Sequence, residues 1–514
     1  MTDTATTQVR QPDTTEEQPP FALAGVGAIA IVSAIALLAS AGRYGFFGDE
    51  LYFISAGRRL AVSYADQGPL LPAIARLMDI IAPESMVAQR IPAILVTVAA
   101  VLISAQIARE FGGARNAQLL TATAYATSPF LLVQGTQLAT NTVDTALWVL
   151  ISWLLIRWVR TRRDSLLLWA SLATALDMQV KWLIPFFWIA IAIGVAFYGP
   201  RDLFRRPALW LGAGLVVLLT LPSLIWQASH DWPQLRLGAV VADEQATIGG
   251  RYTWLPLAIA AAGLLGGLLL IYGIVALFRW EPLRQYRFLA LLPLLLTVAF
   301  IATDGRAYYA AGCYAAIFAA GAVRWTEKTG RLRTIVTSTL IVISVALAAF
   351  TMPWQPESSI KPATSEADAG LAIGVYGKFG WPELAAAAAT AYQSLPEADR
   401  ANVAIITDSY WQASALDVLG TNLPAIYSPN RGYGYFGTPP DTATTILWIG
   451  NNESDVSPLF ASVTPIGRAD ARLGFPGSTR DVTIWRCDQP RAPWSQTWPG
   501  LRDCGFNGGS GPTR

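Results

Sequence analysis

The sequence predicts a mainly α-helical, polytopic membrane protein that carries a soluble α/β domain at its C-terminal end. Composition is the first observation: of 514 residues, 53% are hydrophobic and only 14% are charged, whereas a soluble domain carries roughly 25% charged residues. The second is a run without any charge at 21–42, which is long enough to cross a bilayer because about 20 apolar residues suffice. The third is the polar character of the chain after residue 351.

The N-terminal part divides into a tail and a series of apolar runs. Residues 1–20 are polar and rich in Thr and Pro, so we expect a disordered cytoplasmic tail. The run at 21–42 is too long for a signal-peptide core and is predicted to be an uncleaved anchor. Later runs extend the transmembrane part to residue 351 and bring the expected spans to about eleven, the others lying at 88–108, 117–135, 142–160, 165–180, 182–198, 208–226, 255–278, 288–302, 307–323 and 334–351.

Basic residues predict the orientation of these spans. Arginine and lysine cluster in every second loop, at 109–115, 157–163, 201–206, 279–287 and 324–333. Because such residues are retained on the cytoplasmic side, these loops and the N-terminus are predicted to be cytoplasmic. The long loop at 43–87 and everything after 351 are then external. We expect a multi-pass protein of the plasma membrane.

The segment 352–514 is predicted to be an external soluble α/β domain. The stretches NVAIITD, TTILWIG and DVTIWRC are typical of strands, and WPELAAAAATAYQSLP is typical of an amphipathic helix. Turns rich in Gly, Pro and Asn separate them. Cys487 and Cys504 lie in this segment, and an external location favours a disulfide between them.

Several function classes find no support. The net charge of +2 gives no reason to expect nucleic acid. The chain has no strand–GxGxxG–helix pattern and no Walker-type phosphate loop, so no site for a cytosolic nucleotide is expected. The single histidine, His230, excludes a metal site built from several imidazoles.

Polar side chains recur at the external level of the predicted spans. A charge in or beside the bilayer is costly and usually faces a polar cavity. Simpler interpretations exist: the loop carboxylates are solvated, Lys181 pairs with Asp177 one helical turn away, His230 caps a helix, and Arg306 reaches the headgroups. The sequence alone leaves both readings open for the whole set, which is Asp49, Glu50, Asp66, Asp144, Lys181, His230, Arg306 and Tyr308.

The loop GDELYFISAGRRLAVSYADQGPLLPAIARL resembles the first external loop of membrane glycosyltransferases with the GT-C fold. It is most similar to the bacterial branch related to protein O-mannosyltransferases and aminoarabinose–lipid A transferases, which is glycosyltransferase family 39-like. Asp49-Glu50, an aromatic pair and Asp66-Gln67 match its pattern, but Gly68 stands where a proline is usual. The resemblance continues, in order, through LATNTVDTALW, SLATALDMQVKWLIP, LPSLIWQASHDWPQL and GRAYYAAGCYAAIFAAGA.

The resemblance implies transfer of a sugar from a polyprenyl phosphate to an acceptor hydroxyl on the external face. A direct displacement with one base would invert the anomeric centre. Asp49 matches the catalytic position and would be the general base; Asp144 matches the family's second aspartate. Lys181 and Arg306 are candidates for binding the donor phosphate. The candidates for positioning the acceptor or substrate are Glu50, Asp66, Gln67, His230 and Tyr308.

Three questions stay open at this level. Asp66 and Glu50 are candidate ligands for Mg²⁺ or Mn²⁺, because carboxylates suit hard cations. The acceptor is a lipid, a cell-wall glycan or a protein. The alternative of a different class is a transporter or flippase of a lipid-linked sugar, although transporters typically show repeats and polar groups at the membrane midplane.

Overall fold

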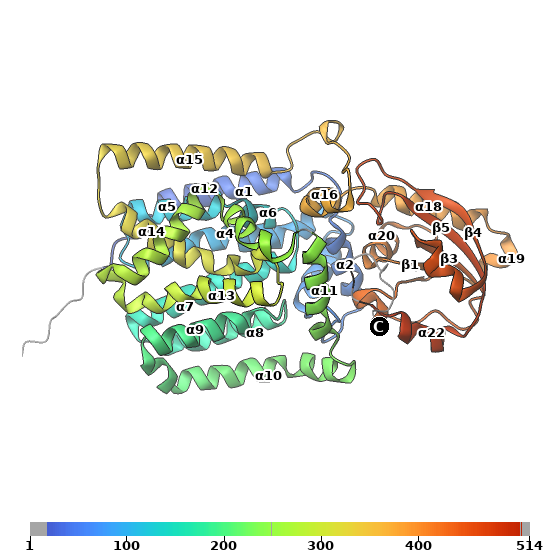
Figure 1. Ribbon diagram of the computed structural model, residues 1–514, viewed down its shortest axis with the longest axis horizontal. Helices are drawn as coiled ribbons and strands as arrows, with labels where there is room; N and C mark the ends of the chain where they lie inside the picture. The colour runs from blue at the N-terminus through green and yellow to red at the C-terminus, as the bar shows by residue number, and fades with distance from the viewer. Residues whose placement is uncertain (1–17, 248, 504, 506–514) are drawn as a thin grey trace, which may run out of the picture.

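The structure, a computed structural model, describes residues 18–247, 249–503 and 505 (Figure 1). A bundle of long helices forms one end of the molecule and a domain built on a β-sheet forms the other (Figure 1). The helices of the bundle are α1 (Leu23–Ser40), α4 (Met86–Glu110), α5 (Arg115–Ala126), α6 (Pro129–Gln134), α7 (Thr140–Thr161), α8 (Ser165–Met178), α9 (Ile184–Tyr198), α10 (Pro207–Ser229), α12 (Gly250–Arg279), α13 (Leu291–Ala302), α14 (Tyr314–Thr326) and α15 (Arg331–Thr351).

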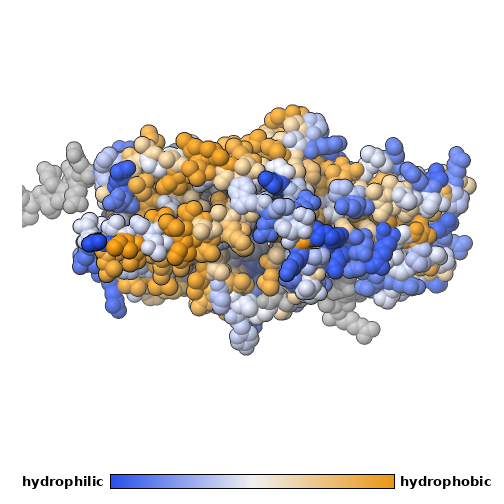
Figure 2. All heavy atoms as spheres, turned by 90° about the horizontal axis from the view of Figure 1, so that it is seen from above, coloured by the Kyte–Doolittle hydropathy of each residue, from blue (hydrophilic) through white to orange (hydrophobic). Residues whose placement is uncertain are grey.

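The bundle agrees with the predicted membrane part. Every predicted span coincides with a helix, or with the pair α5 and α6. Within the described residues, seven helices are long and apolar enough to cross a membrane, and α8 and α9 are shorter apolar helices. Hydrophobic residues dominate the surface of the bundle, whereas hydrophilic residues gather toward the sheet domain (Figure 2). The chain is a multi-pass membrane protein, and the count of about eleven crossings stays a prediction.

Small residues allow the centre of the bundle to pack closely. From Tyr314 to Val323 every residue of α14 is buried, and this stretch is rich in alanine. Gly273 of α12 lies where a Cβ would meet the Ile317 carbonyl oxygen at 2.1 Å. Close approach of backbones through small residues is the usual basis of helix association in membranes. The polar residues discussed below lie at one end of this bundle.

Short helices fill the boundary between the bundle and the sheet domain (Figure 1). They are α2 (Gly48–Gly57), α3 (Leu70–Ile81) and α11 (Pro233–Thr247). All residues of α2 except Asp49 are buried, because α20 (Tyr410–Leu419) of the sheet domain packs directly on it. The loop at 43–87, which the sequence predicts to be external, therefore packs against the C-terminal domain.

The C-terminal domain contains a mixed five-stranded sheet with the order β2-β1-β3-β5-β4. Strands β1 (Val403–Thr407), β2 (Ile426–Tyr427) and β3 (Thr445–Gly450) are parallel. Strand β5 (Val482–Pro490) runs antiparallel to both of its neighbours, β3 and β4 (Phe460–Ala469). The three predicted strands are β1, β3 and β5, and the predicted helix is α18 (Trp381–Ser394). The further helices are α16 (Glu366–Leu371), α17 (Ile373–Tyr376), α19 (Glu397–Arg400), α21 (Glu453–Val456) and α22 (Trp494–Leu501).

Two expectations concern the ends of the chain. Most of the predicted tail at 1–20 lies outside the described residues; at its end, Pro19 accepts a hydrogen bond from Arg109 Nε at 2.8 Å.

Cys487 is buried on β5, and burial raises the pKa of its thiol to about 12. Cys504 lies outside the described residues, so the predicted disulfide stays a prediction.

Candidate functional site

Asp49 stands in the first turn of α2 and is held by the C-terminal domain. Its Oδ1 accepts hydrogen bonds from Tyr410 Oη at 2.7 Å and Trp411 Nε1 at 2.8 Å. Within the described part of the chain, Oδ2 has no hydrogen bond, so one oxygen is oriented and the other is open to a ligand. Gly48 makes this possible, because a Cβ there would meet the Trp411 ring at 2.2 Å.

Asp66 lies close to Asp49. Its Oδ1 accepts a hydrogen bond from Tyr52 Oη at 2.7 Å, which connects it to the buried face of α2. Burial raises the pKa of the Asp66 carboxyl, and the guanidinium of Arg431 opposes that shift. Arg431 interacts with the carboxylates of both Asp66 and Asp49. Burial lowers the pKa of Arg431, but its charged neighbours, these two carboxylates among them, raise it by more.

Glu50 is buried in an ion pair. Its carboxylate forms an ion pair with Arg90 at 2.8 Å, and both side chains are fully buried. The remaining bonds come from Arg90 Nε and from the backbone N–H groups of Phe47 and Leu138, at 3.0, 2.9 and 3.1 Å. Both oxygens of Glu50 are therefore occupied by contacts within the chain.

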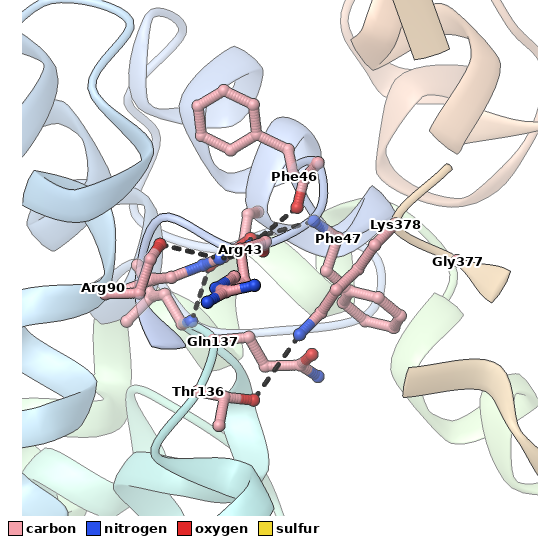
Figure 3. A network of polar contacts seen from close by, with 12 residues as sticks. Arg43, Phe46, Phe47, Arg90, Thr136, Gln137, Gly377 and Lys378 are labelled. Atoms are coloured by element: carbon pink, nitrogen blue, oxygen red, sulfur yellow. Dashed lines mark hydrogen bonds and ion pairs between the residues drawn. The ribbon is translucent and has the colours of Figure 1, made fainter. Parts of the chain in front are cut away.

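The same network anchors the C-terminal domain. Arg90 also donates to the carbonyl oxygens of Ala41 and Gly45 at 2.9 and 2.8 Å, and Lys378 reaches across from the C-terminal domain to Thr136 Oγ1 at 3.5 Å (Figure 3). Burial lowers the pKa of Lys378 to about 7, and the charge of Arg90 adds to this effect. Arg90 thus ties the segment before Asp49 to the bundle, and Lys378 ties the C-terminal domain to the bundle.

Two arginines far apart in the sequence share one carboxylate. Arg306 follows α13, and Arg431 opens a short 3₁₀ helix, η5 (Arg431–Tyr435), in the C-terminal domain. Arg431 Nη2 lies 3.0 Å from Glu244 Oε1, and Arg306 Nη2 pairs with Glu244 Oε2. Arg431 also donates to Tyr410 Oη at 3.3 Å. Glu244, on α11, therefore connects Arg306 with the group that holds Asp49.

Lys181 occupies the other end of the site, at the tip between α8 and α9. Its Nζ donates to Asn141 Oδ1 at 2.7 Å and lies 4.1 Å from the ring centre of Tyr309. The charges of Lys181 and Asp177 interact, but among the described residues the two side chains form no ion pair at contact distance. The ring of Tyr308 stacks on Phe130 at 4.9 Å and also faces Lys181.

Several buried polar atoms near Lys181 lack hydrogen-bond partners within the described residues. They are Oδ1 of Asp144 and both carboxylate oxygens of Asp177, which interact electrostatically with Lys181 and with each other. Both side-chain polar atoms of Gln67 are also buried without a partner. Buried polar groups normally find a partner, so these atoms mark positions for water or a ligand.

The structure brings most of the predicted residues together, with exceptions. We call the set Asp49, Asp66, Arg431, Glu244, Arg306 and Lys181 the polar cluster. Tyr308 and Asp144 adjoin it at Lys181, and Glu50 lies beneath it. His230 does not join the cluster through any contact described: it stacks on Trp226 at 4.1 Å at the end of α10, which supports the capping interpretation.

Sequence reasoning missed Tyr410, Trp411, Arg431, Glu244 and Asn141. Tyr410 and Trp411 lie 361 and 362 positions from Asp49, and no local sequence pattern predicts a contact over that separation. Gly68 is explained by the structure: a Cβ there would meet the carbonyl oxygen of Gln179 at 2.1 Å. The turn at Asp66 therefore packs against the backbone beside Lys181.

Comparison with known proteins decides the fold. A profile of the family described as dolichyl-phosphate-mannose-protein mannosyltransferase matches residues 66–226. The structure of ArnT from Cupriavidus metallidurans bound to undecaprenyl phosphate is similar over 90% of this chain and 98% of that chain, with 13% identity and a TM-score of 0.60. The chain has the GT-C fold. The apo state of the same ArnT gives a TM-score of 0.61 at 13% identity over the same shares.

A third GT-C structure is longer than this chain. Arabinofuranosyltransferase AftD from Mycobacteria matches with 15% identity and a TM-score of 0.50, over 92% of this chain and 40% of that chain. No curated protein matches this chain in sequence.

Proposed function

We propose that this protein is an integral membrane glycosyltransferase that moves a sugar from a polyprenyl-phosphate donor to an acceptor hydroxyl on the external face. The observation that carries the proposal is the carboxylate of Asp49, oriented through one oxygen, at the same end of a GT-C bundle as Lys181 and Arg306. The similarity to a structure that holds undecaprenyl phosphate supports a lipid phosphate as the leaving group.

Asp49 is proposed as the general base. The acceptor oxygen attacks the anomeric carbon, the bond from that carbon to the phosphate oxygen breaks, and the hydroxyl proton passes to Oδ2 of Asp49. Tyr410 and Trp411 fix the other oxygen, so Oδ2 faces a defined direction. A single displacement of this kind inverts the anomeric centre, unlike a retaining mechanism that uses a second carboxylate as nucleophile.

Lys181, Arg306 and Arg431 are proposed to stabilise the phosphate that leaves. Negative charge grows on that phosphate as the bond breaks, and cations placed in advance favour the transition state. Asp144 lies beside Lys181 rather than beside Asp49, so we propose that it positions the lysine and its charge. Tyr308 and Gln67 are proposed to line the donor pocket, and His230 to cap α10 without a part in the reaction.

The surroundings of Asp66 and Glu50 do not fit a divalent cation held by these two side chains. Glu50 is saturated by Arg90 and backbone N–H groups, and Arg431 lies beside Asp66. Among the described residues no group of three acidic, His or Cys side chains is placed to hold a metal. We therefore derive no step through Mg²⁺ or Mn²⁺. Activity that disappears on chelation and returns with Mg²⁺ would contradict this reading.

The C-terminal domain is proposed to bind the acceptor. A pocket of about 420 Å³ lies between α20, β2 and the segment after η5, lined in part by Arg59, Asp417, Tyr433 and Phe436. Arg59 and Asp417 neutralise each other at 2.8 Å, and the guanidinium lies over both rings. Aromatic faces beside a neutral set of donors and acceptors suit a sugar ring, so a glycan is favoured over an anionic acceptor.

Orientation is part of the proposal. A reporter fused after Arg514 should report an external location, and one inserted at 279–287 a cytoplasmic location, because the basic loops face the cytoplasm. The opposite pattern would place the polar cluster on the cytoplasmic side and remove the proposed donor arrangement.

The deciding experiment incubates the purified protein with a panel of polyprenyl-phosphate sugars and an acceptor pool, and follows release of polyprenyl phosphate. We expect release with at least one donor. Movement of an intact donor across proteoliposomes without any release would instead support the transporter or flippase interpretation.

A further inference from the structure

Arg306 and Arg431 hold the carboxylate of Glu244 between them. Each guanidinium meets a different oxygen of Glu244. The three side chains are 27%, 18% and 14% exposed for Arg306, Glu244 and Arg431, so the pairs are partly removed from water. Such pairs are stronger than those on an open surface, and guanidinium groups recognise carboxylate and phosphate with the same fork geometry.

Side-chain contacts connect the two arginines to the proposed base and to the proposed phosphate-binding lysine. Arg431 also donates to Tyr410, which holds Asp49. On the other side, Arg306 interacts with Tyr308 and Tyr309, whose rings face Lys181. An anion between the two arginines is therefore between the proposed base and the proposed phosphate-binding lysine.

The helix that carries Glu244 is not built into a packed core. Most side chains of α11 are exposed or half-buried, in contrast to α14. Besides the pairs of Glu244, Gln234 of α11 and Gln227 of α10 contact each other, α11 packs against α12, and Gln245 is buried. Withdrawal of Glu244 therefore repacks a single, mostly exposed helix, whereas the two arginines belong to the bundle and to the C-terminal domain.

We propose that Glu244 is a displaceable occupant of the donor-phosphate site: it neutralises Arg306 and Arg431 when no donor is bound and is exchanged for the phosphate when one is. This inference rests on the proposed function. Two neighbouring guanidiniums without an anion would repel each other and lose solvation. One anion replaces another in the exchange, so the charge of the site is conserved on entry, and return of Glu244 helps the lipid phosphate to leave.

The test measures binding of undecaprenyl phosphate to the purified full-length protein in nanodiscs. Glu244→Gln keeps the size of the side chain but removes its charge, so the competitor is lost. If Glu244 occupies the site nine-tenths of the time, the apparent Kd should fall about tenfold. Asp243→Asn is the matched control, because Asp243 is the preceding residue of α11 and is exposed; its Kd should equal that of the wild type.

A double variant shows whether the effect passes through the arginine pair. Arg431→Gln should weaken binding of undecaprenyl phosphate, and in that background Glu244→Gln should strengthen it much less than tenfold, since residues of one network do not act additively. Inorganic phosphate, added as a competitor, separates a free phosphate from the lipid headgroup as the bound anion. We expect it to displace undecaprenyl phosphate more effectively from Glu244→Gln than from the wild type, which would assign the effect to the phosphate headgroup.

The outcomes separate this inference from the proposed function. In one outcome the wild-type protein binds undecaprenyl phosphate and Glu244→Gln binds it equally well or more weakly. That result would overturn the inference and leave the proposed function intact. No binding by any variant would overturn both. If Glu244→Gln lowers the melting temperature, the stabilisation on adding undecaprenyl phosphate still reports its affinity and should exceed that of the wild type at the same concentration.

Discussion

The two ends of the polar cluster are built by different parts of the chain. At the carboxylate end, Asp49 is held by Tyr410 and Trp411 of the C-terminal domain. At the cation end, Lys181 is held by Asn141 and Tyr309, both from the bundle. Under the proposed function, both parts of the molecule contribute cations to the phosphate site, Lys181 and Arg306 from the bundle and Arg431 from the C-terminal domain. The hydrogen bonds that orient the proposed base come from the C-terminal domain alone.

The largest effect is expected at the carboxylate end. Asp49→Asn preserves the size of the side chain but cannot take the proton, so turnover should fall by about 10² to 10⁴, while binding of undecaprenyl phosphate should be retained. Release of polyprenyl phosphate and binding in nanodiscs measure the two quantities. Asp231→Asn, in an exposed loop, is the control. Wild-type turnover of Asp49→Asn would remove Asp49 from the mechanism.

Lys181→Ala tests the other end and should behave differently. The phosphate carries charge both before and during bond cleavage, so loss of the ammonium should weaken donor binding as well as turnover. A hydrogen bond to a charged group contributes about 1.5 to 3 kcal/mol, which corresponds to roughly a tenfold to hundredfold weaker Kd for undecaprenyl phosphate. If Lys181→Ala bound undecaprenyl phosphate as well as the wild type but turned over more slowly, it would behave like Asp49→Asn. The two ends of the polar cluster would then not differ in role.

Tyr410→Phe sharpens the comparison from the C-terminal domain. It removes the shorter of the two bonds to Asp49 and a contact of Arg431, while the Trp411 bond remains. We expect turnover to fall about tenfold, since a bond of roughly 1.5 kcal/mol to a charged group is lost, with a much smaller change in the Kd for undecaprenyl phosphate. A larger loss in binding than in turnover would mean that the domain serves the donor rather than the base.

The smallest effect concerns the junction itself. Burial lowers the pKa of Lys378 to about 7, against about 10.4 in an unfolded chain. Between these values the unfolded chain binds a proton that the folded protein does not, so stability should rise as pH increases from about 7 toward 10. Lys378→Met should remove this part of the rise in melting temperature.

Lys361→Met, at an exposed position, is the control for that measurement and should follow the wild-type curve. Glu50 and Arg90 face Lys378 as well, and neither is changed by these variants. Identical pH profiles for the wild type and Lys378→Met would show that Lys378 stays charged in the folded protein.

The sequence by itself determined the class of fold, the apolar spans and strands, and which polar residue types are present for a site. Span-length apolar runs and alternating basic loops need only local composition, because a bilayer demands about 20 apolar residues whatever their neighbours are. Strands β1, β3 and β5 were predictable from their β-branched and aromatic residues. Strand β4 was not, because it contains Pro465 and Gly467, which weaken a strand and are tolerated at this edge, where the pairing is irregular.

Only the tertiary structure decided which polar residues work together. Asp49 and Glu50 are neighbours in sequence, yet one faces the polar cluster and the other is buried against Arg90, because successive residues of a helix point in directions about 100° apart. Arg431 and Arg306 meet at Glu244 only because the C-terminal domain rests on α2. Contacts across hundreds of residues depend on how whole elements dock, and no local pattern of side chains encodes that docking.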